Sequence, residues 1–359
     1  MAKIGVITHW RSADNYGQTI QIYALQRALR DKGAECYLIR YARKDSLLHT
    51  LLKAYKIHRL YAYILRKRNS AKNKELNKKN HRDLQLFIKS NIALSPREYS
   101  RRDLMSNPPE ADIYITGSDQ VWNILDNSYY LDFAPKSAKK FSYAASFGGV
   151  IYENKQLNQL GSLLKSFDAI TVREIEGLEL CKKAGRPDAI LAPDPTFLLS
   201  AKEYGTIAIP PRNSDHYVLL YLLGNENKYD VGSCFSFAEK HNLGIKYVAG
   251  SRQVDDYPKE YPSMEEWLGL IQNAQYVVTN SFHGTVFALI FNKQFITIPL
   301  SGRAQKMNSR IDTLLKTLSL TERISEETEV LLTPIKYQGI NMRLDSLREQ
   351  GHEILSKMI

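Results

Sequence analysis

Short, continuously apolar runs rich in β-branched and aromatic residues recur along this chain, and helical patterns separate them. This alternation constrains the fold because strands without polar alternation are buried on both faces, as in parallel sheets covered by helices. The runs form two groups with a break at residues 200–215, which includes Pro210 and Pro211. The sequence therefore predicts an α/β fold with two Rossmann-like domains that face each other across a central cleft.

The two groups of runs define the predicted strands and domains. In the first group the strands are expected at 3–8, 35–41, 112–117, 140–146, 168–172 and 188–192, and in the second at 217–223, 245–249, 275–280 and 294–299. We predict an N-terminal domain at 1–205, a C-terminal domain at 206–340, and a C-terminal helix at 341–359 that packs back on the N-terminal domain.

The positive charge of the chain is concentrated in one segment. Between Leu51 and Arg82 there are 11 lysines and arginines and one acid, Glu75, so this window carries +10 of the formal net charge of +11. A local block of this kind argues against a nucleic-acid partner, which would favour a basic stripe or a recognisable binding module.

Apolar residues recur with helical spacing inside the basic block, which predicts a helical insertion at about 47–90. Such a helix suits an anionic membrane surface, because lysine and arginine flank its apolar stripe. The alternative is a solvated helix whose stripe packs on its own domain.

Polar residues and glycines gather where the predicted strands end. In open parallel sheets ligands bind at the carboxyl ends of the strands, so the ends of both groups point to the cleft. Arg173 ends one strand and is expected to bind a phosphate or carboxylate. The alternative is an ion pair with Glu174 or Asp194.

His283 lies in the turn between a predicted strand ending at Thr279 and a helix beginning near Gly284. Asn280 or Ser281 can cap this helix, and Gly284 would let a ligand approach the backbone. The free N–H groups and the positive end of the helix predict an anion site here. A structural histidine is the alternative, although the location favours a functional one.

Several motifs are missing from the sequence. There is no G-x-G-x-x-G, no P-loop and no G-x-S-x-G, and the histidines show no metal-ligand spacing. We therefore expect neither a metal nor a cofactor. The three cysteines are far apart and form no C-x-x-C pair, which indicates free thiols in a reducing cytoplasm.

An ordered set of short motifs covers most of the chain: "KIGVITHW", "DNYGQTIQIYALQRALR", "DIYITGSDQVWN", "YAASFG", "VREIEG", "PDPTFLL" and "TNSFHGTVFAL". Together they resemble the bacterial polysaccharide pyruvyl transferase family. The resemblance implies a glycosyltransferase type B (GT-B) arrangement of two Rossmann-like domains. It also implies transfer of pyruvate from phosphoenolpyruvate onto a sugar, usually as a ketal, during synthesis of exopolysaccharide, capsule or cell-wall polymers.

The resemblance implies roles for residues that act on the donor, which is expected on the side of the C-terminal domain. His283 and Arg173 would be catalytic, with His283 acting either as an acid toward the donor or as a base toward the sugar. Members of the family often carry Arg-x-His at this turn, whereas this chain has Ser281-Phe282-His283. Arg310 is the expected substitute for the missing arginine. The full set of expected donor-binding residues is Asn280, Ser281, Gly284, Lys306 and Arg310.

The acceptor is expected on the N-terminal side, where an aromatic face beside hydrogen-bonding groups suits a sugar ring. The expected acceptor-binding residues are Asn15, Tyr16, Ser118, Asp119 and Trp122, with core packing as the alternative for Trp122. If the acceptor is lipid-linked, the basic segment 51–82 would hold the protein peripherally on the inner face of the cell membrane. The sequence does not define the oligomeric state.

Two other functions remain open at this point. One is a nucleotide-sugar glycosyltransferase of the same architecture, and the other is a non-catalytic family member that binds glycan or membrane. Phosphate release from phosphoenolpyruvate would separate the expected activity from both.

Overall fold

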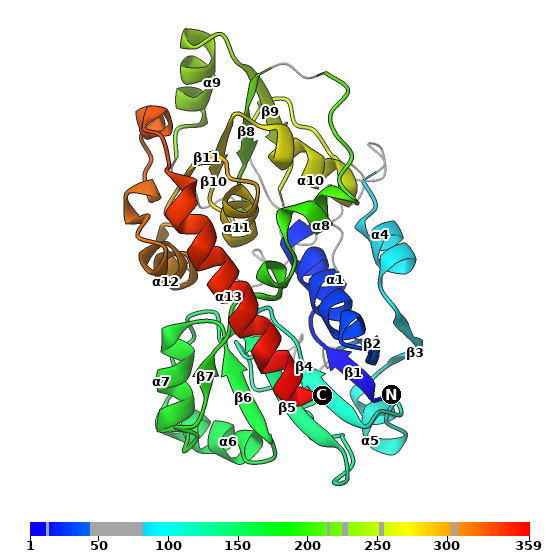
Figure 1. Ribbon diagram of the computed structural model, residues 1–359. Coiled ribbons are helices and arrows are strands. Elements are labelled where there is room, and N and C mark those ends of the chain that lie inside the picture. Colours follow the sequence, from blue (N-terminus) through cyan, green and yellow to red (C-terminus); the bar gives the residue numbers. More distant parts are fainter. Residues whose placement is uncertain are drawn as a thin grey trace, which may run out of the picture.

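The computed structural model describes residues 1–11, 14–43, 82–213, 216–224, 229–250, 255–302, 305 and 308–359. Two parallel sheets organise these residues, and Figure 1 shows one above the other. We refer to the larger sheet with its helices as the N-terminal lobe and to the smaller sheet with its helices as the C-terminal lobe. The boundaries at 205 and 340 remain predictions.

The N-terminal lobe contains a seven-stranded sheet in the order β3-β2-β1-β4-β5-β6-β7, and all its pairings are parallel. Its strands are β1 (Lys3–Ile7), β2 (Glu35–Tyr41), β3 (Leu94–Tyr99), β4 (Ile113–Thr116), β5 (Lys139–Ala145), β6 (Ala169–Val172) and β7 (Ile190–Leu191). In this Rossmann order the direction of winding reverses between β1 and β4, which leaves a crevice at their carboxyl ends.

The C-terminal lobe contains a four-stranded parallel sheet in the order β11-β10-β8-β9. Its strands are β8 (Tyr217–Tyr221), β9 (Gly244–Val248), β10 (Tyr276–Thr279) and β11 (Gln294–Thr297). Winding reverses here between β8 and β10. The sequence correctly predicted this α/β architecture of two Rossmann-like lobes.

Helices connect the strands (Figure 1). In the N-terminal lobe they are α1 (Tyr16–Asp31), α4 (Leu84–Asn91), α5 (Arg101–Ser106), η1 (Asn127–Tyr130), α6 (Asn154–Leu164), α7 (Ile175–Lys183), η2 (Pro195–Leu198) and α8 (Ala201–Gly205). In the C-terminal lobe they are α9 (Val231–Lys240), α10 (Met264–Asn273), α11 (Phe282–Ile290), α12 (Ser309–Thr317), η4 (Thr321–Arg323) and η5 (Thr328–Leu332).

The last helix, α13 (Tyr337–Met358), runs past both lobes (Figure 1). Ile340 and Leu344, near its start, belong to the hydrophobic cluster that contains α10 and α11, whereas Leu355 and Met358 pack with residues of β1 and β5. The helix packs closely at Gly351, where a Cβ atom would lie 2.7 Å from Leu198 Cδ2 and 2.8 Å from the Tyr143 hydroxyl. Both lobes are therefore tied together by apolar contacts along this helix.

Strand β3 was not predicted from the sequence. It contains Pro96, and a proline normally argues against a strand because it cannot donate a hydrogen bond to its neighbour. The structure places β3 at the edge of the seven-stranded sheet, where one side of the strand needs no partner.

The basic segment 51–82 lies outside the described residues except for Arg82, and its predicted membrane contact remains a prediction. Arg82 itself does not face a membrane, because its side chain is buried and donates to the carbonyl oxygen of Ala249. Its guanidinium also lies 5.1 Å from the centre of the Tyr261 ring. Within the described part of the chain, no helix has both the length and the hydropathy needed to cross a bilayer.

Candidate active site

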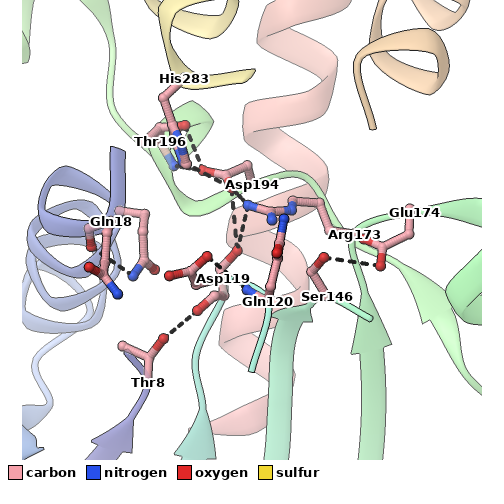
Figure 2. A network of polar contacts seen from close by, with 12 residues as sticks. Thr8, Gln18, Asp119, Gln120, Ser146, Arg173, Glu174, Asp194, Thr196 and His283 are labelled. Carbon is pink, nitrogen blue, oxygen red and sulfur yellow. Dashed lines mark hydrogen bonds and ion pairs between the residues drawn. The ribbon is translucent and has the colours of Figure 1, made fainter. Parts of the chain in front are cut away.

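A buried polar network lies at the carboxyl ends of the strands in the N-terminal lobe, and α11 of the C-terminal lobe contributes His283 to it (Figure 2). Asp194, which follows β7, is its central acceptor. Arg173 Nη1 donates to Asp194 Oδ2 over 2.5 Å, and His283 Nε2 lies 3.6 Å from the same oxygen. The two residues predicted to be catalytic therefore share one buried carboxylate.

The surroundings of Asp194 favour its charged form. Burial alone would raise the pKa of this carboxyl group, but the neighbouring His283 and Arg173 hold its pKa below the ordinary value. The second oxygen, Oδ1, accepts hydrogen bonds from the backbone N–H and the hydroxyl of Thr196 at 3.0 and 2.7 Å. Asp194 is thus an ionised, fixed carboxylate that can orient His283 and Arg173.

Arg173 makes the ion pair with Asp194 that the sequence left as the alternative, and its binding of an anion stays a prediction. Its Nη1 atom makes the ion pair with Asp194 and donates to Ser118 Oγ over 3.3 Å. Its Nε and Nη2 atoms are buried, and no residue in the described ranges accepts a hydrogen bond from them. Buried donors are normally satisfied by protein, water or ligand, so these two atoms indicate a place for an additional acceptor.

Arg310 reaches the same site from α12. Its guanidinium carbon lies 5.5 Å from the centre of the Phe282 ring, and that of Arg173 lies 4.9 Å from the same ring. Burial lowers the pKa of Arg310 to about 10, and the charge of Arg173 adds to this effect. Its Nε atom is buried without an acceptor among the described residues. Two guanidinium groups therefore converge on the ring of Phe282, the residue before His283, and the role of Arg310 as the substitute for the missing arginine stays a prediction.

The residues of the turn that contains His283 make contacts that stabilise the turn itself. Ser281 is the N-cap of α11, and its hydroxyl accepts from the backbone N–H of Gly284 over 3.2 Å. A Cβ atom at Gly284 would lie 2.4 Å from Thr279 Oγ1, so close packing on β10 requires the glycine. The amide of Asn280 binds both the backbone N–H and the carbonyl oxygen of Leu223. The prediction that these three residues bind the donor directly is therefore not supported by their geometry, and Lys306 lies outside the described residues.

Helix α1 of the N-terminal lobe makes close contact with the His283 ring. A Cβ atom at Gly17 would lie 2.0 Å from His283 Nδ1 and 2.4 Å from its Cγ atom. Any side chain at this position would displace the ring or the helix. Gly17 therefore fixes the position of the histidine across the two lobes.

We expect Gly17→Ala to reduce catalytic activity by about 100-fold, because a displacement of roughly 1 Å at a reacting group has an effect of that order. The fold should persist, since alanine is a better helix former than glycine. Steady-state rates and circular dichroism measure the two effects. Gly339→Ala is the matched control, because a Cβ atom there meets nothing within 4 Å. Full activity of Gly17→Ala would contradict the positioning role.

The residues predicted to bind the acceptor divide into two groups. Ser118 belongs to the polar network and donates to Asp194 Oδ2 over 3.3 Å. Asp119 Oδ2 lies 3.6 Å from His9 Nδ1. Asn15 is the N-cap of α1, where its side chain accepts from the backbone N–H of Gln18. Asp119 and Asn15 are partly exposed at the carboxyl edge of the sheet.

The prediction that Tyr16 and Trp122 line the acceptor site is wrong, because both side chains are fully buried. The Tyr16 ring stacks on Trp267 of the C-terminal lobe with 5.0 Å between ring centres, and its hydroxyl donates to the Pro262 carbonyl oxygen. The Trp122 ring stacks on Tyr130 at 5.2 Å. Tyr16 joins the lobes and Trp122 fills the core of the N-terminal lobe.

Sequence reasoning did not assign Asp194, His9 or Gly17 to the site, although each carried a signal. Asp194 and His9 follow predicted strands, at the edge where ligands bind. Gly17 lies in the first turn of α1, and an isolated glycine in a helix indicates close packing or function. The pairing of Asp194 with Arg173 was the alternative that the sequence gave, whereas the contacts of Asp194 and Gly17 with His283 join distant segments that the sequence does not pair.

Comparisons with solved structures identify the architecture. UDP-GlcNAc 2-epimerase from Methanocaldococcus jannaschii superposes with a TM-score of 0.52 at 11% sequence identity, covering 99% of each chain. The same enzyme in complex with UDP-GlcNAc and UDP gives a TM-score of 0.50 at 14% identity, also covering 99% of each chain. At such identities the likeness concerns the fold alone, which is GT-B-like.

The sequence itself was also compared with curated proteins and with family models. No curated protein matches the chain significantly. The model of the family described as polysaccharide pyruvyl transferase matches residues 15–302. This range contains the Arg173–Asp194–His283 cluster and most of both sheets. The chain belongs to the polysaccharide pyruvyl transferase family.

Proposed function

We propose that this protein transfers the pyruvyl group of phosphoenolpyruvate to a sugar of a lipid-linked or polymeric glycan, forming a ketal with two hydroxyl groups. The observation that carries the proposal is the convergence of Arg173 and Arg310 beside the His283–Asp194 pair, with buried guanidinium donors that lack acceptors among the described residues. Membership of the family supports the same reaction class.

The donor suits these side chains. Phosphoenolpyruvate carries a carboxylate and a phosphate, and both are acceptors that match the planar donor groups of arginine. Arg173 Nε and Nη2 and Arg310 Nε would bind these anionic groups. In the proposed reaction arginine and histidine side chains balance the donor charge, and neither a metal nor a cofactor takes part.

The proposed chemistry begins at His283. Its protonated ring, beside the Asp194 carboxylate, donates a proton to the methylene carbon of the donor, which becomes a methyl group. The central carbon becomes electrophilic, and one sugar hydroxyl attacks it. The bond to the phosphate oxygen then breaks with its electron pair on the phosphate, and a second hydroxyl attacks to close the ketal. Of the two hydroxyl protons, one protonates the released phosphate and the other restores the proton that His283 gave to carbon.

The acceptor has room on the N-terminal side. A cavity of about 650 Å³ lies beyond the ends of β2 and β3. It is lined by Tyr41, Arg43, Ser100, Arg101, Arg102, Ile124, Leu125, Asp126 and Asn127. Hydrogen-bonding and aromatic groups of this kind suit a sugar, and we propose that this cavity receives the part of the glycan beyond the reacting residue.

Phosphate release tests the proposed function. Purified protein, phosphoenolpyruvate and glycan acceptors extracted from the producing cells should yield phosphate and a pyruvylated glycan. UDP-sugars supplied in place of phosphoenolpyruvate should yield no transfer. The absence of phosphate with every acceptor, or transfer from a UDP-sugar, would contradict the proposal.

Arg310→Met should raise the KM for phosphoenolpyruvate by about 10- to 100-fold, since a hydrogen bond to a charged group contributes about 1.5–3 kcal/mol. The fold should tolerate this change because methionine replaces a buried charge with an apolar side chain of similar length. Initial rates at varied donor concentrations measure the effect. Arg212→Met, on an exposed loop, is the control and should leave KM unchanged. An unchanged KM in Arg310→Met would remove Arg310 from the donor site.

A further inference from the structure

We propose that His9 is a second catalytic residue, a general base that takes the proton from an acceptor hydroxyl, and that Asp119 positions it. This inference rests on the proposed function and assigns a residue to a step that His283 does not supply. Ketal formation releases protons from two hydroxyls, whereas His283 in its acid role delivers one proton to the donor. A base on the acceptor side would take the first hydroxyl proton and pass it to the released phosphate, while the second hydroxyl proton returns to His283.

The location of this pair matches a ligand crevice. Strands β1 and β4 pair side by side, with Ile7 opposite Thr116. The winding of the sheet reverses between these two strands. Thr8 and His9 follow β1, while Ser118 and Asp119 follow β4. Thr8 Oγ1 donates to the Ser118 carbonyl oxygen, which extends the contact between the two strand ends. The His9–Asp119 pair thus lies at the position where open α/β sheets bind their ligands.

The Asp119 carboxylate is held on two sides. Its Oδ1 atom accepts from the backbone N–H of Gln120 over 2.8 Å, and its Oδ2 atom lies 3.6 Å from His9 Nδ1. Its backbone adopts φ +88°, a left-handed conformation that costs energy for a residue other than glycine. Such strain is concentrated at functional sites, where the surrounding structure enforces it. Here the strained turn directs the carboxylate toward the histidine.

The His9 ring is oriented yet accessible. Tyr129 packs edge-to-face on it with 5.1 Å between ring centres and an interplanar angle of 82°. With Nδ1 beside Asp119, the other nitrogen, Nε2, is left for a different partner, and its side chain is 29% exposed against 10% for His283. A histidine that a carboxylate orients through Nδ1 is suited to accept a proton at Nε2.

The two histidine–aspartate pairs lie next to each other. Ser118, the residue before Asp119, donates to Asp194 Oδ2. Burial alone would raise the pKa of Asp119, but His9 and then Arg173 hold its pKa below the ordinary value. Arg173 therefore acts electrostatically on both carboxylates. Arg173 and Ser118 therefore connect the pair proposed to act on the donor with the pair proposed to act on the acceptor.

The test uses the full chain, phosphoenolpyruvate and glycan acceptors extracted from the producing cells. His9→Ala and His9→Gln should lower kcat by about 100-fold or more, while the Kd for phosphoenolpyruvate, measured by calorimetry, stays within about twofold of wild type. Added imidazole should restore turnover in His9→Ala, and substituted imidazoles of higher pKa should restore more. Asp119→Asn should lower kcat without changing the donor KM. His216→Ala, at an exposed histidine, is the control.

The outcomes separate this inference from the proposed function. A wild-type protein that releases no phosphate contradicts the proposed function itself. Wild-type turnover with full activity in both His9 variants overturns the inference and leaves the proposed function standing. Loss of kcat without rescue by any imidazole assigns His9 a structural role and also overturns the inference.

Discussion

Replacing His283 with glutamine is expected to lower the rate of pyruvyl transfer by about 100- to 10,000-fold, the range that a general acid or base contributes. Glutamine retains a polar side chain beside Asp194 but cannot deliver a proton to carbon. The change leaves the 2.5 Å ion pair between Arg173 and Asp194 in place, so the folded protein should persist. Phosphate release under saturating donor measures kcat, and calorimetry with phosphoenolpyruvate measures donor binding.

The control for this change is His216→Gln, which alters an exposed histidine and should leave the rate unchanged. Activity of His283→Gln within a few fold of wild type would show that His283 is a structural residue. Comparison with Gly17→Ala adds a second check, because that variant keeps the imidazole and changes only its position. Loss of turnover in Gly17→Ala as well as in His283→Gln would show that the position of the ring matters, and not only its presence.

Asp194→Ala is expected to reduce the free energy of unfolding by about 3–5 kcal/mol, the cost of leaving a buried charge without its partner. The Arg173 side chain is 2% exposed, and within the described residues Asp194 is the one acid with which it forms a salt bridge. The variant also loses the hydrogen bonds of Asp194 to Thr196. Urea unfolding followed by circular dichroism measures the change.

A double variant identifies the cause. Arg173→Met combined with Asp194→Ala removes both charges and should be more stable than Asp194→Ala alone, although it should be inactive. Asp31→Ala serves as the control, because its ion pair with Arg27 is exposed and should contribute less than about 1 kcal/mol. A double variant no more stable than the single one would show that the loss comes from the Thr196 contacts instead.

The same aspartate predicts how stability depends on pH. Its pKa in the folded protein is below its unfolded value of about 3.9, so its contribution to stability is present above that pH and is lost as the pH falls further. The wild-type protein should therefore lose stability more steeply than Asp194→Ala between about pH 5 and pH 3. Equal slopes in the two proteins would contradict the depressed pKa.

Much of the fold could be predicted because its signals are local. Each buried strand of the two sheets is an apolar run, and Gly33 ends α1 with a φ of +83°. Strand β3 could not be found in this way, since it lies at an edge and tolerates Pro96. The middle of β3 is Pro96, Arg97 and Glu98, so this strand contains no apolar run of the kind that marks the others.

The candidate site was predictable only as a set of strand ends. Arg173 and His283 follow strands of different lobes, and the sequence indicated both. It could not show that Asp194 joins them, nor that the second lobe covers Tyr16. The contacts of His283 with Asp194 and of Tyr16 with Trp267 depend on how the lobes meet, and they join residues that are far apart in the sequence.

The contact between Gly17 and His283 has a consequence for the timing of the reaction. The imidazole is on the C-terminal lobe, whereas its carboxylate and the glycine that limits its position are on the N-terminal lobe. Any rotation that parts the lobes must separate the acid from Asp194 while leaving each lobe folded. Under the proposed function, proton transfer to the donor would therefore depend on the two lobes being in contact, because the His283–Asp194 pair exists only across them.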